Sequence, residues 1–243
     1  MEYTTEDYYF ASHNNVIDMC KDRKYTTNNN NDLTIFKKEK TEFLNNFENH
    51  ENNHNVLDIM PFETSSQKTF MLDENKLPVY ITFIESKREN KSFIKEIFKN
   101  IYDALKDTVE LSKNNYVKEI LNSLHVIILH NNDTKPGSQY SSNFELFPVR
   151  RHFINVTKHS IVPVHRLLSE EEKQAVFQSK NMTIATCPKI HTDDPVNLYY
   201  NGKLGNLYEI IRNGKAPYYR TVSHGPKGSQ SPFSSQFNTI IKK

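Results

Sequence analysis

Apolar positions repeat with helical spacing in two segments near the start of the chain. In residues 5–22 they recur every three or four positions, and we expect Thr5 to cap this helix. A second helix is predicted to begin at Asp32, with an apolar side formed by Leu33, Phe36, Phe43, Leu44 and Phe47. The Asn-rich segments 28–31 and 49–55 interrupt the pattern. Because Asn side chains compete for backbone hydrogen bonds, these segments predict turns and a loop insertion.

Continuous apolar runs predict the strands that follow. Residues 79–84 and 125–129 are rich in β-branched side chains, which favours strands buried on both faces. Residues 70–72 predict a shorter strand. Between the two long runs, residues 92–111 have the apolar spacing of a helix. Strand, helix and strand in this order predict a right-handed βαβ unit, so the N-terminal part is predicted to be an α/β domain.

Two helices in the C-terminal part have clear start signals. Ser169 with Glu172 three residues later is a capping box, in which each side chain bonds the other's backbone N–H. Asp194 is suited to be the N-cap of the next helix, with Pro195 at the first helical position, where its missing N–H costs nothing. Asn201 and the glycine after it predict the end of this short helix.

The last folded segment is predicted to be a β-hairpin. Residues 206–212 are predicted to form a strand, and Asn213-Gly214 is a strong turn signal that returns residues 218–222 as the partner strand. With the two helices, these strands predict a small α+β domain. Residues 224–243 are rich in Ser, Gly and Pro, and we expect a flexible tail.

Charge is distributed unevenly along the 243 residues. Residues 1–155 hold 19 Lys or Arg against 23 Asp or Glu, whereas residues 156–243 hold 12 against 6. The difference favours two domains, which we place at 1–155 and 156–223. Apolar residues make up 36%, which is low for one compact globule and favours cores separated by polar segments. No dense basic run predicts strong nucleic-acid binding.

Several classes of protein are disfavoured by the sequence. Cys20 and Cys187 are the two cysteines, so a disulfide-stapled secreted domain is not expected. The pattern of a signal peptide and long apolar runs are missing, which predicts an intracellular protein without membrane contact. Six glycines and the lack of a nucleophile-elbow motif disfavour a phosphate-binding loop and a serine hydrolase. We expect no cofactor and no small-molecule substrate.

Two patterns raise metal chemistry as an alternative. Glu85-Ser86-Lys87 directly follows the apolar run 79–84, and an upstream Asp73 or Asp58 would complete the residues of a magnesium-dependent nuclease. Such three-residue matches are common, and a charged strand exit explains this one equally. A structural metal is not predicted, because the pairs His50/His54 and His159/His165 lack neighbouring cysteines.

An ordered series of short motifs between residues 161 and 220 resembles one family. It is the small RNA polymerase subunit that eukaryotes and archaea share, known in eukaryotes as RNA polymerase subunit 5. The motifs are Ile161-Val162-Pro163-Val164-His165, the capped Ser169 helix, Pro188-Lys189-Ile190, Asp194-Pro195-Val196, Tyr199, Lys203, Gly205, Ile210-Ile211-Arg212 and Tyr219-Arg220. Residues 20–25, CKDRKY, are similar to a helix-ending step in the N-terminal domain of the same family.

The resemblance implies a division of labour between the two domains. The N-terminal domain would be a jaw of restriction-endonuclease-like topology beside downstream DNA, and the C-terminal assembly domain would bind the largest polymerase subunit. Neither would do chemistry. Departures from the family pattern are Leu198 in place of Arg, Asn201 in place of Gly, and a shortened 213–218 hairpin. With the Asn-rich insertions they indicate an AT-rich genome, for which we favour a large DNA virus over a protist.

The resemblance also assigns partner-binding residues. They are Val162, Pro163, His165, Asp194, Pro195, Val196, Tyr199, Arg212, Tyr219 and Arg220. Structural alternatives remain: Asp194 is explained by capping alone, and the tyrosines by core packing. Arg212 and Arg220 are suited either to forked contacts with carboxylates of the largest subunit or to ion pairs within the chain.

The sequence therefore predicts a non-catalytic subunit of a multisubunit DNA-directed RNA polymerase. Its expected partners are the largest subunit, other polymerase subunits and, weakly and without sequence preference, downstream duplex DNA. It is expected with the transcription machinery, in the virion and host cytoplasm if viral and otherwise in the nucleus. A free-standing adaptor that binds polymerase is the third possibility, beside the nuclease.

Overall fold

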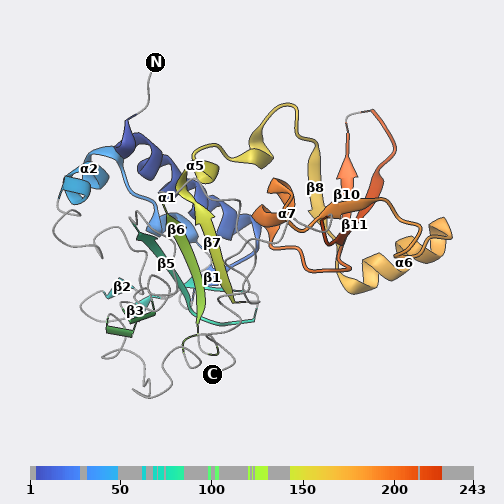
Figure 1. Cartoon of the computed structure of the whole chain (residues 1–243), viewed down its shortest axis with the longest axis horizontal. Helices are drawn as coiled ribbons and strands as arrows, with labels where there is room; N and C mark the ends of the chain where they lie inside the picture. Colours follow the sequence, from blue (N-terminus) through green and yellow to red (C-terminus); the bar gives the residue numbers. More distant parts are fainter. Residues whose placement is uncertain are drawn as a thin grey trace. The chain divides into compact units, whose positions relative to one another are not determined.

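The computed structural model contains two compact units. It describes residues 4–27, 32–48, 62–63, 68–69, 71–73, 75–84, 98–99, 102–103, 120, 122, 124–130, 143–212 and 214–225. The N-terminal unit extends to Ile154, and the C-terminal unit begins at Asn155. Both mix helices and strands (Figure 1). Within the described ranges, no helix combines the length and apolar character needed to cross a membrane.

Some predicted features lie outside the described residues. They include the Asn-rich segments 28–31 and 49–55, the candidate nuclease residues Asp58, Glu85 and Lys87, the histidines His50 and His54, Asn213 of the hairpin turn, most of the predicted helix 92–111, and nearly all of the tail 224–243. The predictions made for these residues stay predictions.

A three-stranded parallel sheet forms the centre of the N-terminal unit. It has the order β5 (Val79–Ile84), β6 (His125–His130), β7 (Phe144–Pro148). The parallel pairing of β5 with β6 and the burial of both apolar runs were predicted and are confirmed. The sequence analysis missed β7, because Glu145 and a terminal proline break up its apolar pattern.

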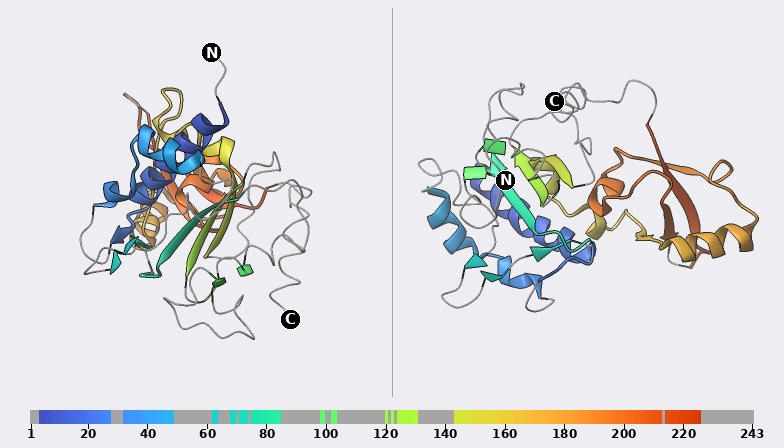
Figure 2. Two further views of the ribbon diagram at one scale, coloured as in Figure 1. Left: turned by 90° about the vertical axis from the view of Figure 1, so that its left-hand side faces the viewer. Right: turned by 90° about the horizontal axis from the view of Figure 1, so that it is seen from below.

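Helix α1 (Thr5–Asp22) packs on one face of this sheet (Figures 1 and 2). The rings of Tyr9 and His13 lie 6.0 and 5.8 Å from that of Phe83 in β5. Ser12 donates a 2.7 Å hydrogen bond to the backbone of Val149, in the short helix α5 (Val149–His152). On the opposite face, Phe98 stacks on Phe144 of β7, with ring centroids 5.2 Å apart. The sheet is therefore covered on both faces.

The cap of α1 was predicted one residue too late. Thr4 is the N-cap, because its hydroxyl accepts from the backbone of Asp7 while the Asp7 carboxylate accepts from the backbone of Thr4. Three residues separate the partners of this box, and Thr5 has no acidic residue at that spacing, since Tyr8 occupies the position.

The single helix predicted from Asp32 is wrong, because two short helices occupy the segment. Asp32 does cap the first, η1 (Leu33–Phe36), by accepting from the backbone of Thr34. In a 3₁₀ turn, side chains three apart share one side, and this places Leu33 and Phe36 together in the core. Lys37 is then extended, and α2 (Lys40–Glu48) follows.

Two small antiparallel pairs complete the described part of the N-terminal unit. Strand β1 (Thr26–Thr27) pairs with β4 (Met71–Leu72), and β2 (Phe62–Glu63) pairs with β3 (Lys68–Thr69). The β1–β4 pair joins the end of α1 to the residues just before β5. It therefore brings residues 23–27 close to the start of the central sheet.

The C-terminal unit is built on a four-stranded mixed sheet. Its order is β8 (Val164–Leu167), β10 (Leu207–Ile211), β11 (Tyr218–Ser223), β9 (Lys189–His191). The predicted hairpin of β10 and β11 is confirmed, and β8 lies antiparallel on the other side of β10. Strand β9 is parallel to β11. The extended entry expected before Ser169 is thus an edge strand.

Helices cover both faces of this sheet. Helix α6 (Glu170–Lys180) packs over a cluster containing Leu168, Cys187 and Leu207, and Figure 2 shows it beside the strands. The opposite core contains Tyr208, Ile210 and Val222, with Tyr200 of α7 (Pro195–Tyr200) packed against it. A short 3₁₀ helix, η2 (Val156–Lys158), precedes β8.

The predicted helix caps of the C-terminal unit are confirmed. Ser169 and Glu172 form the reciprocal capping box of α6. The Asp194 carboxylate accepts from the backbone of Val196 at 2.9 Å, Pro195 occupies the first turn, and Asn201 ends α7 in the left-handed region at φ 53°. The residue in this special conformation is Asn201, so the glycine after it has another role.

Gly202 is required for space. A Cβ there would approach Asn197 Oδ1 and the Tyr208 hydroxyl more closely than van der Waals contact allows. Both side chains are fully buried, and Tyr208 donates to Asn197 at 3.1 Å. We expect Gly202→Ala to lower the free energy of unfolding by about 1–3 kcal/mol. Urea denaturation measures this.

Tyr208→Phe provides the matched background for Gly202→Ala. It removes one of the two crowded oxygen atoms, so Gly202→Ala should cost less in Tyr208→Phe than in the unaltered chain. Equal costs in the two backgrounds would show that the crowding at Tyr208 does not matter.

Candidate functional site

Several residues predicted to bind a partner lie on one face of the C-terminal sheet. Side chains alternate along a strand, so His165 of β8, Tyr218 and Arg220 of β11, and Arg212 just after β10 point to the same side. In the pairing register, Ile210 lies between His165 and Tyr218. The sheet therefore brings together residues that are up to 55 positions apart, counted from His165 to Arg220.

Two of these arginines share one tyrosine ring. The guanidinium carbon of Arg212 lies 4.9 Å from the Tyr218 ring centroid, and that of Arg220 lies 5.8 Å from it. Arg212 also donates a 2.9 Å hydrogen bond to the Tyr218 hydroxyl. Cations are attracted to the faces of aromatic rings, so Tyr218 holds both guanidinium groups. We refer to Arg212, Tyr218 and Arg220 as the arginine–tyrosine stack.

His165 lies on the same face as the stack and is held in a fixed orientation. Its Nδ1 is 2.7 Å from the carbonyl oxygen of Pro163, so Nδ1 carries the proton and donates. Burial lowers the pKa of His165, and the charges of Arg220 and Arg212 lower it further. The Pro163 hydrogen bond and the charge of Asp194 offset this only in part. The positive charge of this face therefore comes from the arginines.

Other predicted partner-binding residues lie elsewhere. Tyr219 points to the opposite face, where its hydroxyl contacts Glu209. Val196 and Tyr199 are 7% and 4% exposed, and the Tyr199 hydroxyl accepts from Asn155. Their side chains belong to the core of the C-terminal unit. Pro195 is exposed, and Val162 is half-buried.

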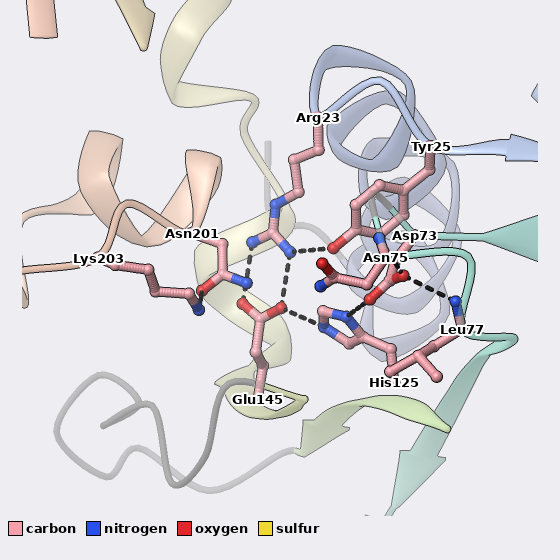
Figure 3. Close-up of polar contacts among 9 residues, drawn as sticks. All are labelled: Arg23, Tyr25, Asp73, Asn75, Leu77, His125, Glu145, Asn201 and Lys203. Atoms are coloured by element: carbon pink, nitrogen blue, oxygen red, sulfur yellow. Dashed lines mark hydrogen bonds and ion pairs between the residues drawn. The ribbon is translucent and has the colours of Figure 1, made fainter. Parts of the chain in front are cut away.

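The N-terminal unit contains a buried ionic network that sequence reasoning did not predict (Figure 3). Arg23 forms a two-pronged ion pair with Glu145, with distances of 2.7 and 2.9 Å. His125 bridges the two carboxylates: its Nε2 is 2.8 Å from Glu145, and its Nδ1 is 2.9 Å from Asp73. Tyr25 accepts from Arg23 at 3.3 Å. We refer to Arg23, Asp73, His125 and Glu145 as the buried ionic network.

The network holds its members in their charged forms. Burial opposes the charge of Glu145, but Arg23 and His125 outweigh it and keep the pKa of Glu145 well below its usual value. Burial also lowers the pKa of His125, but its hydrogen bonds to Asp73 and Glu145 give a net increase. Burial likewise raises the pKa of Asp73, but the hydrogen bond from His125 and the backbone bonds from Leu77 and Asn75 give a net decrease. A protonated His125 between two carboxylates follows.

This arrangement suits a structural role better than metal binding. Asp73, proposed above as a nuclease ligand, accepts from His125 and from the amides of Asn75 and Leu77. Across the described ranges, no group of three His, Cys, Asp or Glu side chains is arranged to hold a metal ion. One local signal pointed to the network, the segment 20–25 that contains Arg23 and Tyr25. Nothing local pointed to His125 or Glu145.

Comparison with known proteins identifies the C-terminal unit. The family described as RNA polymerase Rpb5, C-terminal domain, matches residues 154–222. The DNA-directed RNA polymerase subunit Rpo5 of Pyrococcus horikoshii is 42% identical over 72 residues, which cover 28% of this chain and 88% of the archaeal one. The chain belongs to the Rpb5/Rpo5 family of RNA polymerase subunits.

Longer members of the Rpb5/Rpo5 family match over more residues. The DNA-directed RNA polymerases I, II, and III subunit rpabc1 of Dictyostelium discoideum is 32% identical over 95 residues, covering 36% of this chain and 48% of that protein. The DNA-directed RNA polymerase V subunit 5A of Arabidopsis thaliana is 26% identical over 94 residues, covering 37% and 42%. The resemblance noted from the sequence is confirmed for the C-terminal domain.

The Rpb5-type domain contains the arginine–tyrosine stack and the other predicted partner-binding residues, since all of them fall within 154–222. Leu198, which departs from the family motif, is 4% exposed and belongs to the core. A surface anchor at that position is therefore replaced by an apolar side chain. Residues 1–153 lie outside the matched region.

Proposed function

We propose that the chain is a non-catalytic subunit of a multisubunit DNA-directed RNA polymerase, held there by its C-terminal unit. The observation that carries this is the match to the archaeal Rpo5 over 88% of its length. A relative that consists of little more than this domain has little else with which to assemble. The same segment forms a compact unit with its own sheet and two cores.

We propose the C-terminal unit as the part that docks on the largest polymerase subunit. The face bearing His165, Arg212 and Arg220 is the favoured contact surface, with Pro163 and Asp194 beside it. Val196 and Tyr199 act beneath this surface by fixing its shape, because their side chains are buried. Tyr219, on the other face, and the exposed Pro195 and half-buried Val162 extend the proposed contact area.

For the N-terminal unit, we propose the role of a jaw beside downstream duplex DNA, with a restriction-endonuclease-like topology. The parallel sheet β5–β6–β7, covered by α1 on one face, supports an α/β arrangement of this kind. DNA contacts would go to phosphates, without sequence preference, and would weaken as salt is raised. No cofactor, metal or small-molecule substrate enters this proposal.

The proposed function places the chain with the transcription machinery in the cell. A viral origin, favoured above from the sequence, finds no support in the relatives, since those named above belong to cellular organisms. The nucleus is therefore the favoured location in a eukaryotic source, with the virion and host cytoplasm kept for a viral one.

A native pull-down tests the proposal. The full chain, tagged and expressed in its own organism, should co-purify in a one-to-one ratio with the largest RNA polymerase subunit and the other subunits, as measured by quantitative mass spectrometry. A free-standing adaptor would instead be substoichiometric and would wash off as salt is raised. Recovery of the chain without polymerase subunits would contradict both possibilities.

A further inference from the structure

Arginines of the C-terminal sheet fall into two classes. Arg166 is paired within the chain: it donates to Glu209 at 2.9 Å and also pairs with Glu172 of α6. Arg212 and Arg220, in contrast, contact Tyr218, and neither forms an ion pair with a carboxylate in the described part of the chain. The open alternative for these two arginines, an ion pair within the chain, is therefore not what the described residues form.

The stack holds two like charges close together without an anion. Both guanidinium carbons lie within 6 Å of one ring centroid, so their charges repel each other. The Nε atom of Arg220 is also buried, with no acceptor among the described residues. A buried N–H without a partner is unfavourable, and a negative group from outside would relieve the repulsion and occupy the remaining guanidinium donors.

We propose that the arginine–tyrosine stack is a binding site for carboxylates of an acidic segment in the partner subunit. This deepens, and rests on, the proposed docking of the C-terminal unit. A guanidinium presents N–H donors in a planar fork that matches the two oxygens of an Asp or Glu side chain. Two guanidinium groups held on one ring would take up two such carboxylates, or one carboxylate between them.

The surroundings favour a protein over a nucleic acid as the occupant. Val164 and Ile211 lie opposite each other on β8 and β10, at this end of the sheet, and are 63% and 42% exposed. A polypeptide offers apolar side chains that bury such residues, whereas a phosphate backbone does not. Two cations are also few beside the roughly six to ten phosphate contacts of a typical DNA-binding surface.

Tyr218 is a positioning residue in this site. Its hydroxyl accepts from Arg212, and its ring lies under both guanidinium groups. The partner-binding residues assigned from the sequence included Tyr219, but Tyr218 is the one that the geometry places between the arginines. Tyr218→Phe would keep the ring and lose the acceptor, whereas Tyr218→Ala would lose both.

Incorporation of full-length variants into polymerase gives the first test. We expect Arg212→Ala with Arg220→Ala to reduce the amount of chain that co-purifies with the largest subunit at least tenfold, and Tyr218→Phe to reduce it less. Arg166→Ala is the matched control, since that arginine is already paired within the chain, and should change incorporation less than twofold. Circular dichroism and thermal unfolding establish that each variant is folded.

Zero-length cross-linking identifies the occupant directly. A carbodiimide joins lysine amines to carboxylates, so Arg212→Lys and Arg220→Lys variants in native polymerase should each link to an Asp- or Glu-containing peptide of a co-purified subunit. Arg166→Lys should link to Glu172 or Glu209 of its own chain. Both Lys variants keep the charge, which preserves incorporation for the measurement.

The outcomes separate this inference from the function on which it rests. Normal incorporation of the double Ala variant, or Lys variants that incorporate without any intermolecular carboxylate link, would overturn the carboxylate site and leave the subunit assignment intact. Release of the chain from polymerase by nuclease treatment would assign the stack to nucleic acid instead. Failure of the unaltered chain to co-purify with polymerase would overturn the proposed function, and this inference with it.

Discussion

Replacing Arg23 with Ala should lower the free energy of unfolding of the N-terminal unit by about 3–5 kcal/mol. The side chains of Arg23 and Glu145 are 2% and 1% exposed, so removing the guanidinium leaves a buried carboxylate without its main counter-charge. A charge left in this state costs far more than the pair contributes, because water cannot replace the lost partner. The cost is comparable to the whole stability of a small domain.

Urea denaturation of the full chain, followed by circular dichroism, measures the effect of Arg23→Ala. Lys37→Ala is the control: it breaks the Lys37–Asp18 ion pair, in which the lysine side chain is 35% exposed, and should cost at most about 1 kcal/mol. A double variant with Arg23→Met and Glu145→Leu removes both charges and should be more stable than Arg23→Ala. Similar losses for Arg23→Ala and Lys37→Ala would show that the network does not hold the unit together.

Acid should unfold the N-terminal unit between pH 6.5 and about 4. Burial lowers the pKa of His13, His130 and His152 from 6.5 to about 4 in the folded chain. Within this window, the unfolded chain takes up a proton at each histidine and the folded chain does not, so the free energy of unfolding falls as the pH falls. Full separation of the two pKa values is worth roughly 3 kcal/mol for each histidine.

The buried ionic network responds to pH with different signs. His125 has a raised pKa, so its stabilisation is complete below pH 6.5 and is lost as the pH rises through its folded pKa. Asp73 and Glu145 have lowered pKa values, so their stabilisation is present above 3.8 and 4.5 and is lost at lower pH. Between pH 6.5 and 4.5 the three neutral histidines therefore dominate.

Unfolding in urea at a series of pH values from 7 to 4 tests the acid effect. His152→Phe keeps an aromatic ring against Phe147 and removes one titrating group, so its stability should fall less steeply with pH. The exposed His159, in the other unit, provides the control variant His159→Gln, which should keep the original slope. An unchanged slope in His152→Phe would exclude this histidine as a source of the acid sensitivity.

Local signals in the sequence were sufficient for most of the C-terminal unit. Caps, a proline at a helix start and a turn signal act over a few residues, so Ser169, Asp194 and the β10–β11 hairpin were predicted in place. Motifs fix the order of elements and leave the exposure of a side chain open. Val196 and Tyr199 were therefore assigned to the surface, although packing places both in the core.

Long-range contacts were beyond the reach of sequence patterns. The buried ionic network joins Arg23, Asp73, His125 and Glu145, which are spread over more than a hundred residues. Each has an ordinary neighbourhood in sequence, and only the parallel register of β6 and β7 brings His125 near Glu145. In the candidate site, both arginines were predicted. The place of Tyr218 between them follows from strand alternation, which becomes known only once the pairing is fixed.

The position of β11 in its sheet sets an order of events during protein synthesis. This last strand pairs with β10 on one side and with the much earlier β9 on the other. Residues 189–191 therefore have no place in the sheet until the ribosome has released residues 218–223. The three strands of the N-terminal sheet, in contrast, are complete at Pro148. The N-terminal unit can thus fold while translation continues, whereas the polymerase-binding unit can assemble only near its end.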